Sequence, residues 1–424
     1  MEVTISPSRI KGTITAPASK SAMQRACAAA LLRKGQTLLI NPGISADDKA
    51  ALQIIQQLGA YIEYRNDDIF ITSDGVKPVA DEINCGESGL SLRMFTSIAA
   101  LSPNKIKITG HGSLAKRPLH FFDEVLPRLG VQCKSNNGFL PLEIRGPLQP
   151  RTISIDGSLS SQFLTGLLFA YSIACAKNVS IKVHHLASKP YVDLTLHTLR
   201  AFWMCIPENK KYQSFLFHPY STKISTTKSI VYVIESDWSN AAFLLVAGAV
   251  AGSITIHGLD LNSVQGDKRI LEVLEMTKAF IHVLPGEIKV SQSDLIAFDF
   301  DATDCPDLFP PLVALACYCK GVSTIRGVHR LTHKESNRAV TLQSEFAKMG
   351  VNITIAEDAM HVAGEEKIKG ARVSSNNDHR IAMALAIAAL NAGGETVIEN
   401  AEAVNKSYPA FWDDLQKLQN NSIV

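Results

Sequence analysis

Basic side chains stand directly before apolar segments in this sequence. In the stretch PASKSAMQRACAAALL, residues 17 to 32, Lys20 and Arg25 precede a run of alanine and leucine without another charge. The N-terminus of a helix presents unpaired N–H groups and the positive end of the helix dipole, so lysine or arginine beside it completes a site for an anion. The spacing therefore predicts an anion site at the mouth of a buried helix.

The same arrangement recurs at five later apolar segments. Polar motifs open these segments as GESGLSLR, SLSSQ, SDWSNAA, DCPDLFPP and NDHR. One such motif would fit an ordinary helix cap, but recurrence at equivalent points favours a shared binding role. The side chains and glycine that we single out are Gly89, Arg93, Ser160, Ser161, Gln162, Asp237, Asp307, His379 and Arg380.

Three further motifs, AKRPL, HKESNR and NKSYP, are expected at the start of a second, amphipathic helix. A phosphomonoester carries about −1.5 to −2 near neutral pH, so two ligands that each carry a phosphate and a carboxylate would bring roughly −5 to −6. The motifs supply an excess of six positive charges, which matches two such ligands. The count takes eight cations, Lys20, Arg25, Arg93, Arg117, Lys334, Arg338, Arg380 and Lys406, against the carboxylates of Asp307 and Glu335.

The elements that position these residues form a unit that occurs six times. Each unit has an apolar helix, a β-branched strand, an amphipathic helix and a hairpin, which gives a βαβαββ repeat. A helix that is apolar all round must be enclosed, so we expect the apolar helices inside and the sheets outside. A chain of 424 residues suits two domains. We predict a two-domain inside-out α/β (α+β) fold with three repeats per domain, residues 20–235 forming the first domain and residues 1–19 with 236–424 the second.

Composition narrows the class of protein. The formal net charge of +2 gives no basic surface for nucleic acid. The longest apolar runs, such as residues 241–252, are about half of the roughly 20 residues that cross a bilayer, so we expect no membrane span. The eight cysteines form no CxxC pair, which argues against zinc and indicates reduced, buried thiols in a cytoplasmic protein.

The motifs SKSAMQR, GESGLSLR, KRPL, SSQFLTGLL, SKPYVDLTL, CPDLFPPLVALA, HKESNR, NDHRIAMALA and NKSYP together resemble those of the 5-enolpyruvylshikimate-3-phosphate synthase family. They follow in order along essentially the whole chain. The resemblance implies a two-domain enzyme that closes on its substrates and transfers the enolpyruvyl group of phosphoenolpyruvate to the 5-hydroxyl of shikimate 3-phosphate, releasing phosphate. It implies the shikimate pathway of aromatic amino acid biosynthesis, no metal, no cofactor and a cytoplasmic monomer.

The resemblance also implies roles for individual residues. Asp307 would be the base at the 5-hydroxyl, Glu335 the acid at the methylene carbon, and Lys20 an electrostatic partner or alternative acid. As a simpler alternative, Asp307 caps the fifth apolar helix, alone or in addition. Shikimate 3-phosphate would be held by Lys20, Ser21, Arg25, Ser160, Ser161, Gln162, Ser188, Tyr191, Asp307 and Lys334. Phosphoenolpyruvate would be held by Lys20, Gly89, Arg93, Arg117, Gln162, Glu335, Arg338, Arg380 and Lys406.

The sequence departs from the family pattern at Ala18, Glu87, Leu90 and Arg330, and the binding roles of Glu87 and Arg330 stay open. A carboxylate at Glu87 is unfavourable near a phosphate unless it turns toward a cation. One alternative is the sister enolpyruvyl transferase that acts on UDP-N-acetylglucosamine, but the loop GHGSLAKRPL has neither its thiol nor its acid. Another is an inactive relative that binds small molecules, and a related RNA 3′-phosphate cyclase would need a basic surface.

Overall fold

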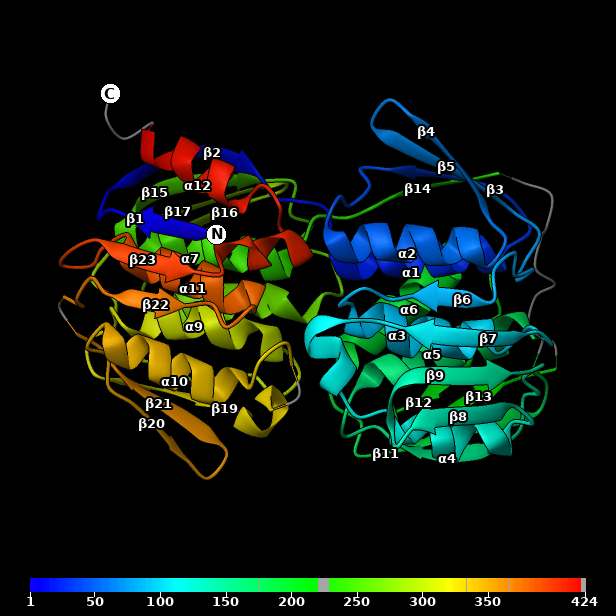
Figure 1. The fold of residues 1–424 in the computed structure, drawn as a ribbon. Coiled ribbons are helices and arrows are strands. Elements are labelled where there is room, and N and C mark those ends of the chain that lie inside the picture. Colours follow the sequence, from blue (N-terminus) through cyan, green and yellow to red (C-terminus); the bar gives the residue numbers. More distant parts are fainter. Residues whose placement is uncertain (175, 220–228, 333, 366, 421–424) are drawn as a thin grey trace. The chain divides into compact units, whose positions relative to one another are not determined.

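The structure is a computed structural model that describes residues 1–174, 176–219, 229–332, 334–365 and 367–420 (Figure 1). The chain divides into two compact units, each with its own hydrophobic core. Unit 1 comprises Met1–Pro17 and Glu235–Val424, and unit 2 comprises Ala18–Ile234. Unit 2 begins two residues before the boundary that we predicted at residue 20, and the second part of unit 1 begins one residue before the boundary that we predicted at residue 236.

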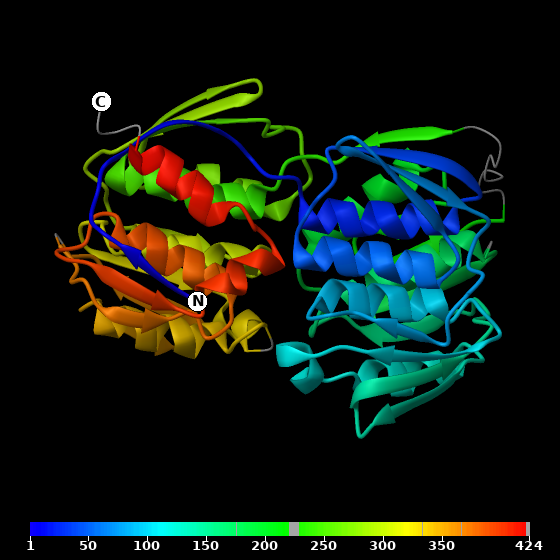
Figure 2. The ribbon, with the colours of Figure 1, turned by 45° about the horizontal axis from the view of Figure 1, so that its top comes forward.

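Within the described residues, six helices lie inside the units because most of their residues are small or apolar on every side. Every residue of α7 is buried, and so is every residue of α3. Figures 1 and 2 show α7, α9 and α11 packed against one another in unit 1. The inner helices of unit 2 are α1 (Lys20–Leu32), α3 (Gly89–Ala99) and α5 (Ser161–Ile173), and those of unit 1 are α7 (Trp238–Ala251), α9 (Phe309–Ala316) and α11 (His379–Ala389).

Six further helices of the described ranges cover the sheets and inner helices with one apolar face. In α2 the predicted apolar side, which includes Leu52, Ile54 and Ile55, is buried. The prediction of an amphipathic second helix is confirmed there. These helices are α2 (Ala46–Gln57), α4 (His120–Arg128), α6 (Lys189–Ala201), α8 (Ile270–Met276), α10 (Arg338–Lys348) and α12 (Phe411–Asn420).

The described residues form six small sheets, five with four strands and one with three. In unit 2 the orders are β14 (Ile230–Val233), β3 (Gly35–Ile40), β5 (Asp68–Ser73), β4 (Tyr61–Arg65); β6 (Glu82–Asn84), β7 (Lys105–Thr109), β9 (Phe139–Arg145), β8 (Gln132–Asn136); and β10 (Ile153–Asp156), β11 (Val179–His184), β13 (Ser214–Phe217), β12 (Glu208–Lys210). In unit 1 they are β16 (Phe280–Leu284), β17 (Glu287–Ser291), β15 (Gly252–His257), β2 (Ile10–Thr15); β18 (Asp299–Asp301), β19 (Val322–Arg326), β21 (Ala359–Ala363), β20 (Ile353–Ala356); and β1 (Glu2–Ile5), β23 (Thr396–Glu399), β22 (Arg372–Ser374). In four of the sheets the strands that flank one inner helix pair in parallel. In the other two, the strand after α1 pairs in parallel with β14, which precedes α7, and the strand after α7 pairs in parallel with β2, which precedes α1.

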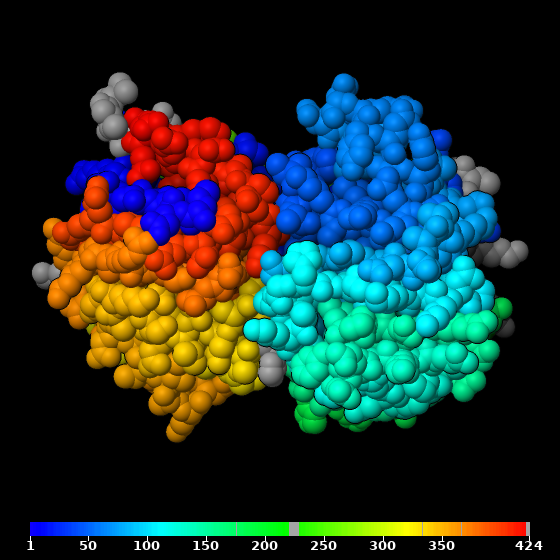
Figure 3. All heavy atoms as spheres, viewed as in Figure 1, coloured from blue at the N-terminus to red at the C-terminus, as the bar shows by residue number. Residues whose placement is uncertain are grey.

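Three strands join sheets far from their own position in the sequence. The N-terminal strand β2 pairs with β15, and β14 pairs with β3. The strand β1 pairs with β23, so it takes the place that a hairpin fills in the other repeats. Figure 3 shows the blue N-terminal residues on the surface beside the orange and red residues of unit 1. Each of these three strands therefore completes a sheet of its own unit whose other strands lie far away in the sequence.

Two findings bear on the class of protein. Within the ranges given above, no helix is long and apolar enough to cross a bilayer. Seven described cysteines are free thiols, six of them buried and Cys133 partly exposed. The eighth, Cys175, lies outside the described residues.

Candidate active site

In unit 2, polar side chains join the N-terminal ends of the three inner helices. The Gln24 Oε1 atom accepts hydrogen bonds from Ser88 Oγ at 3.0 Å and Ser91 Oγ at 2.9 Å, which links α1 to α3. Arg93 Nη1 donates to Gln162 Oε1 at 2.8 Å, which links α3 to α5. The structure thus brings together motifs that lie far apart in the sequence.

Arg25 is a buried cation in this network, with no exposed surface. Its guanidinium donates to Thr195 Oγ1 at 3.0 Å, to the Ser21 carbonyl at 2.8 Å and to the Tyr191 carbonyl at 3.1 Å. Burial lowers the pKa of Arg25 to about 10, so the group remains protonated at neutral pH. Because these three acceptors are neutral, the positive charge is available to an anion.

Two arginines meet at the first residue of α3. A Cβ atom added to Gly89 would lie 2.4 Å from Arg117 Nη1 and 3.3 Å from Arg93 Nη1. Arg93 and Arg117 are only 4% and 6% exposed. Guanidinium groups at a helix N-terminus add to the positive end of the dipole, and their fork geometry suits phosphate. A side chain at Gly89 would displace the guanidinium of Arg117.

Lys20 has an acidic partner that we missed in the sequence. Its Nζ atom lies 3.0 Å from Asp47 Oδ2, at the start of α2. The adjacent Asp48 forms a capping box with Ser45. Burial raises the pKa of Asp48 to about 7, although the hydrogen bond from Ser45 opposes the rise. The two consecutive acids in ISADDKAAL were the available signal, but only the fold shows that one of them faces Lys20.

The predicted serines lie at helix starts in unit 2. Ser160 caps α5 by accepting from the Gln162 N–H at 3.2 Å, and Ser161 is buried. Ser188 precedes α6 with φ +58, a left-handed conformation that is uncommon outside glycine. Its side chain makes no capping hydrogen bond. The unit 2 cluster is defined as Lys20, Ser21, Arg25, Gly89, Arg93, Arg117, Ser160, Ser161, Gln162, Ser188 and Tyr191.

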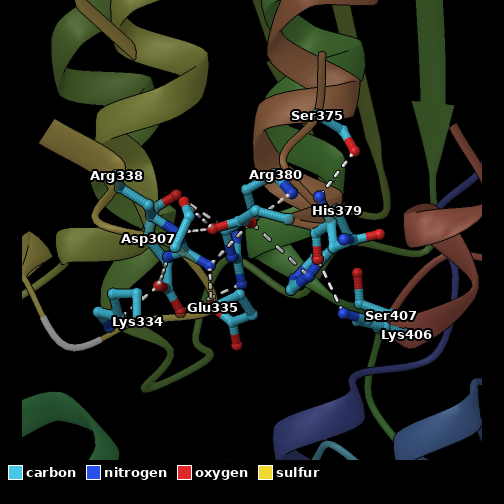
Figure 4. Close-up of polar contacts among 12 residues, drawn as sticks. Asp307, Lys334, Glu335, Arg338, Ser375, His379, Arg380, Lys406 and Ser407 are labelled. Carbon is cyan, nitrogen blue, oxygen red and sulfur yellow. Dashed lines mark hydrogen bonds and ion pairs between the residues drawn. The ribbon is translucent and has the colours of Figure 1, made fainter. Parts of the chain in front are cut away.

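In unit 1, Asp307 lies among three cations (Figure 4). Its Oδ1 atom is 2.8 Å from Arg338 Nη1 and 3.3 Å from Lys334 Nζ, and its Oδ2 atom is 3.1 Å from Arg380 Nη2. Burial by itself raises the pKa of Asp307, but the three cations outweigh it and hold the pKa well below its usual range. Asp307 is therefore ionised and weakly basic in this arrangement.

The alternative in which Asp307 caps the fifth inner helix is wrong. Asp307 lies in a short 3₁₀ helix, η3 (Pro306–Leu308), and α9 starts after it without a side-chain cap. The second and third residues of α9 are Pro310 and Pro311, which have no N–H to receive a cap. The carboxylate of Asp307 is thus committed to the cations.

Arg338 is held by three carboxylates and is 1% exposed. Its Nη2 atom donates to Glu335 Oε2 at 2.5 Å, and its Nε atom donates to Asp378 Oδ2 at 2.8 Å. Burial opposes the charge, but Asp378, Glu335 and Asp307 together raise the pKa of Arg338. Asp378, which we had not singled out, also caps α11 by accepting from the Arg380 N–H at 3.0 Å.

Lys334 and Lys406 have different surroundings. Burial lowers the pKa of Lys334, while Asp307 opposes this change and the charges of Arg338 and Arg330 reinforce it. Arg330, in η4 (Val328–Leu331), therefore lies close enough to affect Lys334. Lys406 ends η5 (Ala401–Lys406) and donates to the Asn377 carbonyl at 2.8 Å. The unit 1 cluster is defined as Asp307, Lys334, Glu335, Arg338, Asp378, His379, Arg380 and Lys406.

Other predicted positions need correction. Arg338 begins α10 as expected. Arg117 directly follows the 3₁₀ helix η1 (Gly112–Lys116) and Lys406 is the last residue of η5, so neither opens an α-helix. Asp237 caps α7 through the Asn240 N–H at 2.8 Å. The six-charge excess is also too large, because Asp47 and Asp378 raise the carboxylates from two to four and leave an excess of four. In the part of the chain that is described, no group of three acid, histidine or cysteine side chains is placed to hold a metal ion.

The family model and the curated relatives agree on one family, and two solved structures share the fold. The family model described as EPSP synthase (3-phosphoshikimate 1-carboxyvinyltransferase) matches residues 5–415. The 3-phosphoshikimate 1-carboxyvinyltransferases of Clostridium novyi and Clostridium acetobutylicum are 35% and 37% identical, each alignment covering 98% of this chain and 97% of the relative. The solved structure of EPSP synthase from Acinetobacter baumannii aligns with a TM-score of 0.81 at 24% identity, covering 99% of this chain and 98% of the other. The enolpyruvyl transferase NikO from Streptomyces tendae aligns with a TM-score of 0.76 at 16% identity, covering 98% and 96%.

Proposed function

This chain belongs to the EPSP synthase (3-phosphoshikimate 1-carboxyvinyltransferase) family, and from that membership we propose how its two polar clusters bind and convert the substrates. The enzyme transfers the enolpyruvyl (carboxyvinyl) group of phosphoenolpyruvate to the 5-hydroxyl of shikimate 3-phosphate and releases phosphate. The reaction belongs to the shikimate pathway of aromatic amino acid biosynthesis. UDP-N-acetylglucosamine is not favoured as the acceptor. The inside-out α/β fold that we predicted is also that of the EPSP synthases.

Shikimate 3-phosphate would bind to the part of the unit 2 cluster around Arg25, with Asp307 and Lys334 from unit 1. The supporting observation is the buried Arg25 guanidinium, whose three acceptors are neutral oxygens. A phosphate or hydroxyl oxygen that reaches this charge gains a charge-assisted hydrogen bond in a site with little water. The proposed contacts are Lys20, Ser21, Arg25, Ser160, Ser161, Gln162, Ser188, Tyr191, Asp307 and Lys334.

Phosphoenolpyruvate would place its phosphate at the start of α3. The observation that carries the proposal is the convergence of Arg93 and Arg117 on Gly89, where no side chain blocks the helix N-terminus. The carboxylate of phosphoenolpyruvate would pair with the arginines of unit 1. The proposed contacts are Lys20, Gly89, Arg93, Arg117, Gln162, Glu335, Arg338, Arg380 and Lys406.

The chemistry needs one proton removed and one added. The 5-hydroxyl loses a proton as its oxygen attacks C2 of phosphoenolpyruvate, and the methylene carbon gains a proton, which gives a tetrahedral adduct. Loss of phosphate and of a proton from the methyl group then restores the enol double bond. We propose Asp307 as the base and Glu335 as the acid, with Lys20 balancing the charge.

A weakly basic Asp307 needs a change on binding before it can accept a proton. Its longest ion pair is the one to Lys334, at 3.3 Å. Lys334 is also a proposed contact of shikimate 3-phosphate, so a bound anion would compete with Asp307 for this ammonium. Losing one of three cations would raise the basicity of Asp307 when the substrate is present.

The test is release of inorganic phosphate by the purified enzyme. We expect release with shikimate 3-phosphate and phosphoenolpyruvate together, and none above background with either alone. Replacing shikimate 3-phosphate by UDP-N-acetylglucosamine should abolish release. No release with the correct pair would support an inactive relative and would refute the proposal.

We also propose that the enzyme acts as a monomer in a reducing compartment such as the cytoplasm. The free state of the seven described cysteines supports a reducing compartment. Light scattering at micromolar protein would measure the mass, and a dimer would refute the monomer.

A further inference from the structure

The side chain of Glu87 contacts the loop that carries Arg117. The Glu87 Oε2 atom accepts a hydrogen bond from the Ser113 N–H at 3.2 Å, in the first turn of η1. A Cβ atom on Gly112 would lie 2.3 Å from the same oxygen. Gly112 also has φ +60, which favours glycine. The Glu87 carboxylate therefore packs against Gly112 and occupies the space that a side chain on residue 112 would take.

The two loops involved follow the neighbouring parallel strands β6 and β7. They are joined at the base by the hydrogen bond from the His111 N–H to the Gly86 carbonyl, at 2.9 Å. At its far end, η1 closes with the Arg117 N–H bonded to the Leu114 carbonyl at 3.1 Å. Residues 86–89 thus contact both the start of the loop and, through Gly89, the guanidinium at its end.

We propose that Glu87 is a positioning residue that acts through Arg117. The residue before η1, His111, gives it no side-chain cap, so Glu87 supplies the acceptor from the neighbouring loop. A carboxylate that accepts a backbone N–H at the start of a helical turn makes a stronger bond than a neutral group. It holds η1 in place, and η1 places the Arg117 guanidinium at the start of α3 for the phosphate of phosphoenolpyruvate.

This inference rests on the proposed function, because it assigns the role of Arg117 toward phosphoenolpyruvate. It also explains how the chain tolerates an acid near a proposed phosphate site. The hydrogen bond directs Oε2 toward Ser113.

Steady-state kinetics of two variants separate the hydrogen bond from the charge. Glu87→Ala removes both, and Glu87→Gln keeps an acceptor oxygen of the same reach. We expect Glu87→Ala to raise KM for phosphoenolpyruvate by about tenfold, the lower end for a hydrogen bond to a charged group. KM for shikimate 3-phosphate and kcat should change less than twofold, and Glu87→Gln should stay within threefold of the wild type. The control is Glu124→Ala, which removes an exposed acid from α4 in the same unit.

A double-mutant cycle tests whether the effect passes through Arg117. In an Arg117→Ala background, Glu87→Ala should produce no further rise in KM for phosphoenolpyruvate. Gly112→Ala, which would displace the carboxylate, should raise the same KM. The inference is overturned if Glu87→Ala leaves that KM unchanged, if the rise persists without Arg117, or if Glu87→Gln is as impaired as Glu87→Ala. Failure of the proposed function would appear separately, as no phosphate release by the wild type.

Discussion

Gly89→Ala would add a single methyl group at the first residue of α3. Gly89 does not have a positive φ, and Ser88 still caps the helix, so the backbone accepts alanine without strain. The new Cβ would lie 2.4 Å from Arg117 Nη1. Because ordinary contacts are about 3.5 Å or longer, the guanidinium must move by about 1 Å. The perturbation therefore falls on the position of Arg117.

The size of the effect follows from the bond that would be lost. A hydrogen bond between charged groups contributes about 1.5–3 kcal/mol, which corresponds to about ten- to a hundredfold in affinity. We expect KM for phosphoenolpyruvate to rise by that factor. KM for shikimate 3-phosphate should change little, because its proposed contact Arg25 is bonded to α6. The melting temperature should not fall, since alanine is favoured over glycine in helices by about 1 kcal/mol.

The assay is phosphate release at varied concentrations of each substrate, with the melting temperature measured on the same protein. Gly394→Ala is a matched control, because the nearest atoms to its added Cβ lie 4.0 Å away. An unchanged KM for phosphoenolpyruvate would refute the reasoning, and so would an equal rise for both substrates.

Two further substitutions test the charges. Asp307→Asn should lower kcat by about two orders of magnitude or more, and should lower the melting temperature because removing one partner of a buried pair costs about 3–5 kcal/mol. Because folding lowers the pKa of Asp307, the stability that this carboxylate contributes is present above its unfolded pKa near 3.8 and is lost at lower pH. Near-normal kcat and a near-normal melting temperature of Asp307→Asn at pH 7 would contradict its roles as base and as ion-pair partner. Asp48→Asn should flatten the pH dependence of stability, because a pKa raised from 3.8 to about 7 means that wild-type stability falls as pH rises through this window. The fall in the free energy of unfolding is at most roughly 4 kcal/mol, at about 1.4 kcal/mol per pKa unit. Urea unfolding at pH 5 and pH 8 measures it, and an equal change in this free energy for the wild type and Asp48→Asn would count against the prediction.

The repeat and the inner helices were predictable because their signal is local. A helix such as α7, apolar on every side, identifies its own surroundings. The pairing of β1 with β23 was not predictable, because alternation along a strand identifies the strand but not its partner. The sequence therefore predicted the fold class, and left open which strand completes the sixth sheet.

The site shows the same division between local and tertiary signals. Cations at helix starts were predictable because the helix dipole gives their position a physical meaning. The acids that neutralise them were not, because Asp47 and Asp378 look like ordinary first-turn or capping residues until the fold brings Lys20 and Arg338 beside them. The alternative that Asp307 caps α9 was wrong for a local reason that was visible in the sequence, because Pro310 and Pro311 in the first turn have no N–H to donate to a cap.

The corrected charge balance suggests a division of labour between the clusters. In unit 2, four cations face the single carboxylate of Asp47, an excess of three, if the half-protonated Asp48 is left aside. In unit 1, four cations face Asp307, Glu335 and Asp378, an excess of one. An anion that approaches Arg338 must compete with three carboxylates already in contact with it, whereas one that approaches Arg25 meets no such competitor. We therefore expect the unit 2 cluster to supply most of the binding free energy for the anions. The acids of unit 1 keep the proton-transfer groups coupled to one another, so that a bound substrate changes their pKa values by displacing a partner.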